Sequence, residues 1–192
     1  LALTRGTSQV QDHLKEAETA AIRGANLISQ LMIFSRGQEK DLCLEAVDLA
    51  ADIGNTVSLC RKTIDRRIEL RMEIAPHLPW VQADAGQLEQ ALLNLYLNAR
   101  DALEGVERAI PCIRTSVRLA CKIERGKADV RDFVCIEVAD NGVGMDPRTR
   151  ERVFSPFFTT KPVGKGTGLG LATVYGILQR HQGWIECQSQ AG

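Results

Sequence analysis

The stretch DNGVGM, residues 140–145, follows an apolar, strand-like run, and a second glycine-rich stretch, GKGTGLGL, lies at residues 164–171. Asp140 at a strand end is a suitable acceptor for an exocyclic amine such as N6 of adenine. The glycines let the backbone approach a flat ring closely. The second stretch runs into a helical pattern, where free N–H groups and the helix dipole favour an anion. Each stretch alone is compatible with an ordinary turn or loop, but as a pair they predict a nucleotide site.

The second stretch fits neither of the two familiar nucleotide patterns. Gly166 follows Lys165 where a P-loop needs Ser or Thr, and Leu171 stands where the dinucleotide pattern needs glycine. Lys161 and Lys165 lie between the two glycine clusters, with phenylalanines just before them. Apolar anchors with basic tips fit a lid over a polyphosphate, although an exposed basic loop is the simpler interpretation.

A strong helical pattern precedes both stretches, from residue 84 to 103, with Asp84 as its N-cap and Gly105 beyond its end. At about 100° per residue, one broad face is apolar and another carries a narrow polar stripe. The stripe holds Gln87, Gln90, Asn94, Asn98 and Asp101. Asparagine is a poor residue in the middle of a helix, and its amide oxygen suits Mg²⁺. A solvated face is the alternative interpretation.

The remaining patterns mix helices and strands without strict alternation, which predicts an α+β fold rather than a doubly wound sheet. Further helices are expected at residues 48–64, 147–153 and 168–182, the last with Gly168 and Gly170 in its first turn. Strands are expected at residues 67–74, 80–82, 110–123, 133–139 and 184–188. Alternation in the first of these strands predicts one buried face, made of Ile68, Leu70, Met72 and Ile74.

Composition indicates an ordinary globular protein. Among 192 residues, 24 Lys and Arg balance 24 Asp and Glu, which gives no electrostatic case for nucleic acid or an anionic membrane as partner. No apolar run approaches the length of a membrane span. The six cysteines are scattered, without a C-x-x-C pair or a histidine placed to complete a zinc site. They indicate reduced, structural thiols in a cytosolic protein.

Four segments carry a family resemblance. NLYLNARDA at residues 94–102 resembles the N box of the GHKL ATPase superfamily, residues 140–145 resemble its first glycine box, and residues 166–171 its second. FSPFFTTK at residues 154–161 resembles the F box of sensor histidine kinases. The resemblance implies the fold of that superfamily, a two-layer α/β sandwich with a mixed sheet packed on helices.

The resemblance extends to the N-terminal part. Residues 10–35 follow the spacing of a heptad seam, and one helix cannot bury such a stripe alone. This long helix resembles the second helix of a kinase dimerisation and phosphotransfer domain. We therefore expect residues 1–37 to be part of a helical hairpin, residues 38–42 a linker, and residues 43–192 an ATP-binding catalytic domain that lacks the family's last strand.

The resemblance implies a site for ATP and Mg²⁺. Asn98 would bind Mg²⁺, Asp140 would read adenine, and Asn94 would be a catalytic group near the metal or its waters. The other expected ATP contacts are Asp101, Gly142, Gly144, Met145, Lys161, Lys165, Gly166, Thr167, Gly168, Leu169 and Gly170. The implied activity is that of a histidine protein kinase, which transfers the γ-phosphoryl group of ATP to a histidine for relay to the receiver domain of a response regulator. The implied assembly is a homodimer through the helical hairpin.

The family's phosphoacceptor histidine is not found in this sequence. His13 has the wrong neighbours, and His77 and His181 are expected to be structural. We therefore expect a piece of a longer protein, cut at both ends, that does not phosphorylate itself. It would be cytoplasmic and contact neither nucleic acid nor membrane, although absent segments could anchor the intact protein.

Other readings of the family resemblance stay open. One is another GHKL ATPase, of the mismatch-repair, gyrase or chaperone type, or an anti-sigma-factor serine kinase. The hydrolases carry a catalytic glutamate about where Asn94 stands, which argues against them. Another is a nucleotide-binding or partner-binding module without activity.

Overall fold

The computed structural model describes residues 42–106, 110–123, 130–162 and 166–192, with the side chains of residues 121–123 and 130–131 left aside. Residues 41–192 form one compact unit. The predicted N-terminal helix and all of the linker except Leu42 lie outside the described residues.

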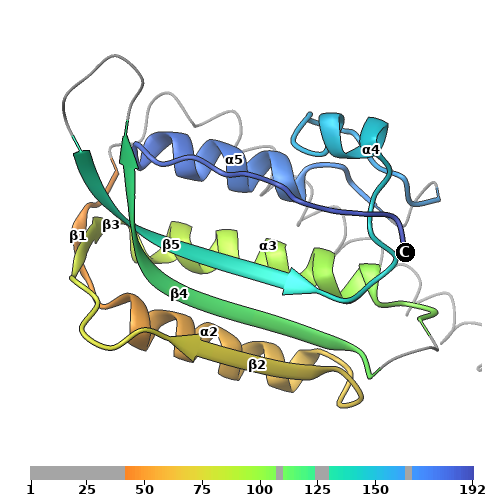
Figure 1. Ribbon diagram of the computed structural model, residues 1–192, viewed down its shortest axis with the longest axis horizontal. Coiled ribbons are helices and arrows are strands. Elements are labelled where there is room, and N and C mark those ends of the chain that lie inside the picture. Colours follow the sequence, from red (N-terminus) through yellow and green to blue (C-terminus); the bar gives the residue numbers. More distant parts are fainter. Residues whose placement is uncertain (1–41, 107–109, 124–129, 163–165) are drawn as a thin grey trace, which may run out of the picture. The chain divides into compact units, whose positions relative to one another are not determined.

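The strands of the described residues form two sheets. β1 (Glu45–Val47) pairs antiparallel with β3 (Val81–Ala83). In the larger sheet, β4 (Cys112–Ile123) is central, parallel to β2 (Glu69–Ile74) and antiparallel to β5 (Val130–Asp140). Figure 1 shows helices α2 (Leu49–Thr63), α3 (Ala85–Ala102) and α5 (Gly170–Arg180) side by side on one face of this sheet. The predicted two-layer α+β fold with a mixed sheet is confirmed.

Aspartate caps fix where three helices begin. The carboxylate of Asp48 accepts from the N–H groups of Ala50 and Ala51 at the start of α2, and Asp84 accepts from the N–H of Gln87 at the start of α3. Asp146 caps the short α4 (Pro147–Arg152), whose first residue is a proline. Such caps satisfy N–H groups that have no partner inside the helix, so these three predicted starts are confirmed.

The core lies between the helices and the larger sheet. Ile53 of α2 and Ile113 of β4 are fully buried, and the hydroxyl of buried Tyr96 contacts that of buried Thr115. Burial raises the pKa of the Tyr96 phenol. Leu70 and Ile74 of β2 pack against this core as predicted, but the prediction for Met72 was wrong. Met72 is 41% exposed, because β2 is an edge strand and its middle is less covered.

Three local predictions differ from the structure. Residues 184–188 form no strand; the segment instead packs Trp184 edge-on against Phe133, with ring centroids 4.5 Å apart. β1 was not predicted, because a strand of three residues has too little alternation to be recognised. Gly168 lies outside the first turn of α5, which begins at Gly170 with Leu169 as its N-cap.

His181 connects the two helices that flank the expected site. Its Nε2 accepts a hydrogen bond from the N–H of Asp84 (3.0 Å), and its Nδ1 lies 2.8 Å from the carbonyl oxygen of Ile177. Because a backbone N–H can only donate and a carbonyl can only accept, the ring is neutral with its proton on Nδ1. His181 thus ties the end of α5 to the N-cap of α3, which is a structural role.

Replacing His181 with phenylalanine should lower the free energy of unfolding by about 1–2 kcal/mol, since the ring volume is kept while Asp84 loses its hydrogen-bond acceptor. Urea denaturation of the chain measures this loss. Glu89→Gln is the control, because Glu89 is exposed on α3 and surface changes stay within about 0.5 kcal/mol. Equal stability of the two variants would contradict the connecting role of His181.

Candidate nucleotide-binding site

Asn94 and Asn98 both lie on α3, and the surroundings of their side-chain amides differ. Asn94 is 8% exposed, and within the described part of the chain its Nδ2 has no hydrogen-bond partner. Asn98 donates from Nδ2 to the carbonyl oxygen of Asn94 (2.8 Å), so its amide oxygen is turned away from the helix backbone. A buried amide without a partner is uncommon in folded proteins, and it marks a place where a polar ligand fits.

The start of α5 lies against these two asparagines. A Cβ at Gly170 would stand 3.3 Å from Nδ2 of Asn98 and 3.6 Å from Oδ1 of Asn94. Among the described residues, the N-terminus of α5 has no side-chain cap, and the first N–H groups of a helix suit an anion. The structure therefore brings the polar stripe of α3 and the second glycine cluster together.

The second glycine cluster is packed against the loop that precedes it. Gly168 has a φ of +66°, and a Cβ there would overlap the backbone of Phe157. A Cβ at Gly166 would stand 2.6 Å from Oγ1 of Thr159. Gly168 therefore needs glycine, both for its conformation and for its backbone neighbour, whereas the neighbours of Gly166 are side chains.

Two neighbours complete this cluster. The hydroxyl of Thr167 accepts a hydrogen bond from the N–H of Leu169 (3.3 Å). Leu169 is 1% exposed as a whole residue, and its carbonyl oxygen accepts from the N–H and the hydroxyl of Thr173, so Leu169 supports this turn from inside the fold.

Asp140 ends β5 opposite Ile113, at the edge of the larger sheet. Its side chain is exposed and accepts a hydrogen bond from the N–H of Gly142 (2.9 Å).

Asn141, next to Asp140, holds this end of the strand in place. The Oδ1 of Asn141 accepts from the N–H of Cys112 (2.8 Å), and its Nδ2 donates to the carbonyl oxygen of Ile110 (2.9 Å). Sequence reasoning gave Asn141 no role, because these partners lie 29 and 31 residues away.

The two glycines of the first cluster are held between α3 and the C-terminal residues. A Cβ at Gly142 would overlap the carbonyl of Ala102 at the end of α3. Gly144 has a φ of +66°, and a Cβ there would overlap the carbonyl of Gln190. Met145 donates its N–H to the hydroxyl of Ser189 (2.9 Å). Figure 1 shows the C-terminus beside the end of β5.

A charged cluster joins the loop before the second glycine cluster to α3. The carboxylate of Asp101 contacts the ammonium group of Lys161 and accepts two hydrogen bonds from the guanidinium group of Arg100 (2.9 and 2.6 Å). Lys161 therefore lies beside the last turn of α3, while Lys165 lies outside the described residues.

Two groups near the first glycine cluster have shifted pKa values. Hydrogen bonds from the Thr149 hydroxyl and from backbone N–H groups of α4 lower the pKa of Asp146. Burial raises the pKa of the Cys187 thiol, while the charge of Arg150 lowers it and that of Asp140 raises it. Cys187 therefore lies close enough to Asp140 to sense its charge, which its place in the sequence did not predict.

Both ring nitrogens of His181 are engaged, and His77 sits at a φ of +60° in the exposed loop between β2 and β3. His13 lies outside the described residues.

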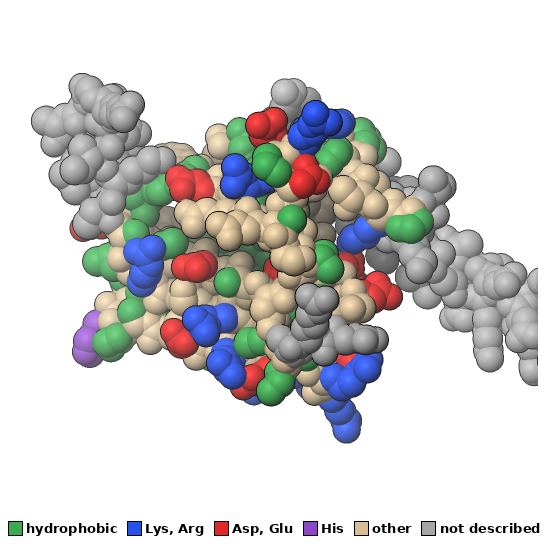
Figure 2. Space-filling view, turned by 45° about the vertical axis from the view of Figure 1, so that its right-hand side comes forward, with side chains coloured by type: hydrophobic (Ala, Val, Ile, Leu, Met, Phe, Trp, Pro, Cys, Tyr) green, Lys and Arg blue, Asp and Glu red, His purple; other side chains and the backbone are tan. Residues whose placement is uncertain are grey.

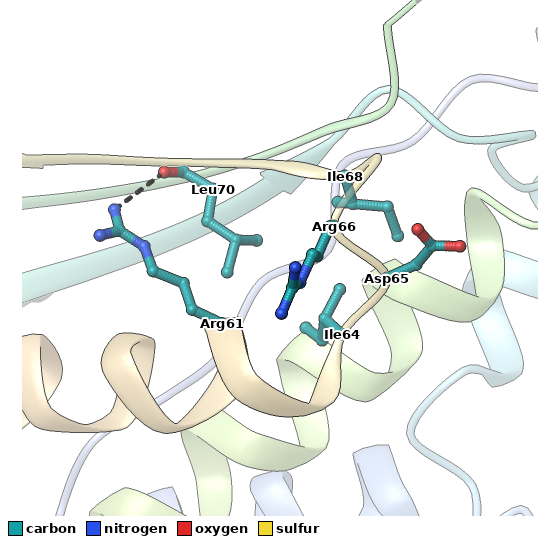
Figure 3. Close-up of a pocket in the computed structure, with 6 residues that line it drawn as sticks. All are labelled: Arg61, Ile64, Asp65, Arg66, Ile68 and Leu70. Atoms are coloured by element: carbon teal, nitrogen blue, oxygen red, sulfur yellow. Dashed lines mark hydrogen bonds between the residues drawn. The ribbon is translucent and has the colours of Figure 1, made fainter.

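Away from these residues, the described surface has a further hollow. A cavity of about 210 Å³ lies where α2 turns into β2, lined by Arg61, Ile64, Asp65, Arg66, Ile68 and Leu70 (Figure 3). None of these is a predicted site residue. Acidic and basic side chains are interspersed on the face drawn in Figure 2. Within the described ranges, the helices are all too short or too polar to cross a membrane.

The comparisons with known proteins agree with this arrangement. The sensor kinase CckA of Brucella abortus (strain 2308) is 40% identical over 173 residues, which cover 90% of this chain but only 18% of that protein. The full-length ShkA structure in complex with AMPPNP matches with a TM-score of 0.64 and 26% identity, over 86% of this chain and 34% of that one.

The structure of histidine kinase ThkA in complex with response regulator protein TrrA shares the fold, with a TM-score of 0.62 at 22% identity, over 86% of this chain and 43% of that one. Residues 83–192 match the family described as histidine kinase-, DNA gyrase B- and HSP90-like ATPases. The chain therefore belongs to this ATPase family, as an ATP-binding catalytic domain of the histidine kinase kind.

Proposed function

We propose that this chain binds Mg²⁺–ATP between α3 and the N-terminus of α5 and presents its γ-phosphoryl group to a histidine on a segment outside this chain. The proposal rests on one observation: Gly170 lies next to the side chains of Asn94 and Asn98. At this place the buried Nδ2 of Asn94 has no hydrogen-bond partner among the described residues. A ligand with phosphate oxygens would supply that partner.

The base would lie toward the first glycine cluster. In this proposal, the exposed carboxylate of Asp140 accepts from the exocyclic amine of adenine, and Gly142, Gly144 and Met145 floor the base pocket. The backbone of residues 166–170 and the ammonium groups of Lys161 and Lys165 contact the phosphates. Lysine is a point charge suited to phosphate oxygens.

The residues present also fit a magnesium ion. The amide oxygen of Asn98 is a hard, neutral oxygen ligand, and its Nδ2 is already engaged, so the oxygen is the atom left to bind a metal. Asn94 would support the metal or its waters. When bound, Mg²⁺ neutralises charge on the phosphates, which is a large part of what phosphoryl transfer needs.

The proposed partners follow from the same chemistry. The intact protein would be a homodimeric histidine kinase, with residues 1–37 as one helix of the dimerisation hairpin, residues 38–42 as linker and residues 43–192 as catalytic domain. It would pass the phosphoryl group to the receiver domain of a response regulator in the cytoplasm. The solved complex of ThkA with TrrA supports this choice of partner.

Calorimetric titration tests the nucleotide site. The unaltered chain should bind Mg²⁺–ATP, and Asn98→Ala should lower the affinity about tenfold or more, because it removes an oxygen ligand of the metal. With EDTA in place of Mg²⁺, the two proteins should bind ATP equally. Asn55→Ala, on the exposed side of α2, is the matched control. If the unaltered chain did not bind ATP, the proposed function would be wrong.

Labelling with γ-³²P-ATP separates the kinase from the alternatives. The chain alone should take up no acid-labile label, since the proposed acceptor histidine lies on a segment outside this chain. Sustained release of inorganic phosphate would instead indicate a hydrolase.

A further inference from the structure

Asp101 belongs to the polar stripe of α3, and both of its carboxylate oxygens accept hydrogen bonds from cationic side chains. It lies at the last turn of α3, its side chain is 23% exposed, and its carboxylate meets both the Arg100 guanidinium group and the Lys161 ammonium group. Arg100 contacts one carboxylate oxygen, Oδ1, and Lys161 contacts the other, Oδ2. Such charge-assisted bonds are the stronger kind of hydrogen bond.

These contacts argue against Asp101 as a direct ligand of a nucleotide. A carboxylate repels phosphate, and both oxygens of this one already accept from cations. We propose that Asp101 is a positioning residue, which holds the ammonium group of Lys161 at the phosphate end of the site. This inference rests on the function proposed above and replaces the direct ATP contact that the sequence suggested for Asp101.

The side chain of Lys161 lies next to the second glycine cluster. A Cβ at Gly166 would stand 3.1 Å from both Cβ and Cδ of Lys161, so the lysine side chain runs along the second glycine cluster. Asp101 follows Asn98 by three residues on α3, which puts the two side chains on the same face. The ammonium group is therefore held between the end of the asparagine stripe and Gly166.

The charges of the cluster are compatible with binding an anion. Arg100 offsets the negative charge of Asp101, so the three side chains together keep one net positive charge. A lysine side chain has many rotamers, and fixing it on an anion costs conformational entropy. Asp101 makes that restriction before the ligand arrives, as in other preorganised sites.

A double-mutant cycle on the 192-residue chain tests the role, with calorimetric ATP affinity as the readout. Lys161→Met should weaken ATP binding about tenfold, Asp101→Asn by a comparable factor, and the double variant no more than either alone. Asp101→Glu, which keeps the carboxylate, should restore most of the loss. Glu104→Gln, an exposed carboxylate just beyond α3, is the control and should leave affinity unchanged.

Two further measurements distinguish positioning from a loss of structure. Adenosine has no phosphate, so its affinity, followed by NMR titration, should be the same in all variants. Without nucleotide, hydrogen exchange at the amides of residues 157–162 should be faster in both Asp101→Asn and Lys161→Met, with the unfolding midpoint kept within about a degree.

The outcomes separate this inference from the function on which it rests. Additive losses in the double variant, or weaker adenosine binding in Asp101→Asn, would overturn the positioning role while ATP binding by the unaltered chain stood. No ATP binding by the unaltered chain would overturn both. Stronger ATP binding in Asp101→Asn would show that Asp101 competes with the phosphates for Lys161, and would also overturn the inference.

Discussion

Gly144→Ala is expected to destabilise the chain by about 2–4 kcal/mol, the sum of an unfavourable left-handed conformation and a steric overlap. Its φ is +66°, and the added Cβ would overlap the carbonyl of Gln190. That neighbour is backbone, so it cannot turn aside as a flexible side chain would. Relief requires residues 189–191 to separate from the loop after β5, which also removes the contact between Met145 and Ser189.

Urea denaturation checks this prediction against a glycine that lacks both constraints. Gly54 lies inside α2, and a Cβ there would meet nothing within 4 Å. Gly54→Ala should therefore raise stability by about 0.5–1 kcal/mol, the helix preference of alanine over glycine. If both substitutions changed the midpoint in the same direction, the packing argument for Gly144 would be wrong.

Asp140→Asn is expected to weaken nucleotide binding by about 1–3 kcal/mol, because one buried polar group of the bound base loses a charged acceptor. The fold should be unaffected, since the side chain is exposed and an asparagine oxygen still accepts from the N–H of Gly142. Calorimetry with ATP measures the affinity, and the unfolding midpoint should not move.

Asp146→Asn is the matched control for Asp140. Asp146 is also exposed, lies six residues later and caps α4, and asparagine is an equally good N-cap. Its substitution should leave ATP affinity unchanged. Unchanged affinity in Asp140→Asn would show that adenine is not read by this carboxylate.

Local patterns were enough to predict the elements that position the site. The caps Asp84 and Asp48 and the proline of α4 act within a few residues of themselves, and their helices begin where the sequence indicates. The polar stripe of α3 follows from helix periodicity alone, and the structure places Asn94 and Asn98 of that stripe against Gly170.

Features that depend on distant residues could not be read from the sequence. The partners of Asn141 and the proximity of Cys187 to Asp140 arise from strand pairing and chain reversal, not from spacing. Residues 184–188 alternate like a strand, but a strand also needs a continuous backbone ladder, and this segment instead packs Trp184 on Phe133. Gly168 has a φ of +66°, which an α-helix does not contain, so α5 begins at Gly170.

The packing of Gly144 against Gln190 has a consequence for biosynthesis. The ribosome makes a chain from its N-terminus at about 5–20 residues per second, so Gln190 emerges on the order of seconds after Gly144. During that interval the first glycine cluster lacks the neighbour that covers it. A ligand stabilises only the state that binds it. A nucleotide that needs the covered form of the first glycine cluster can therefore stabilise the nascent chain only after Gln190 has emerged.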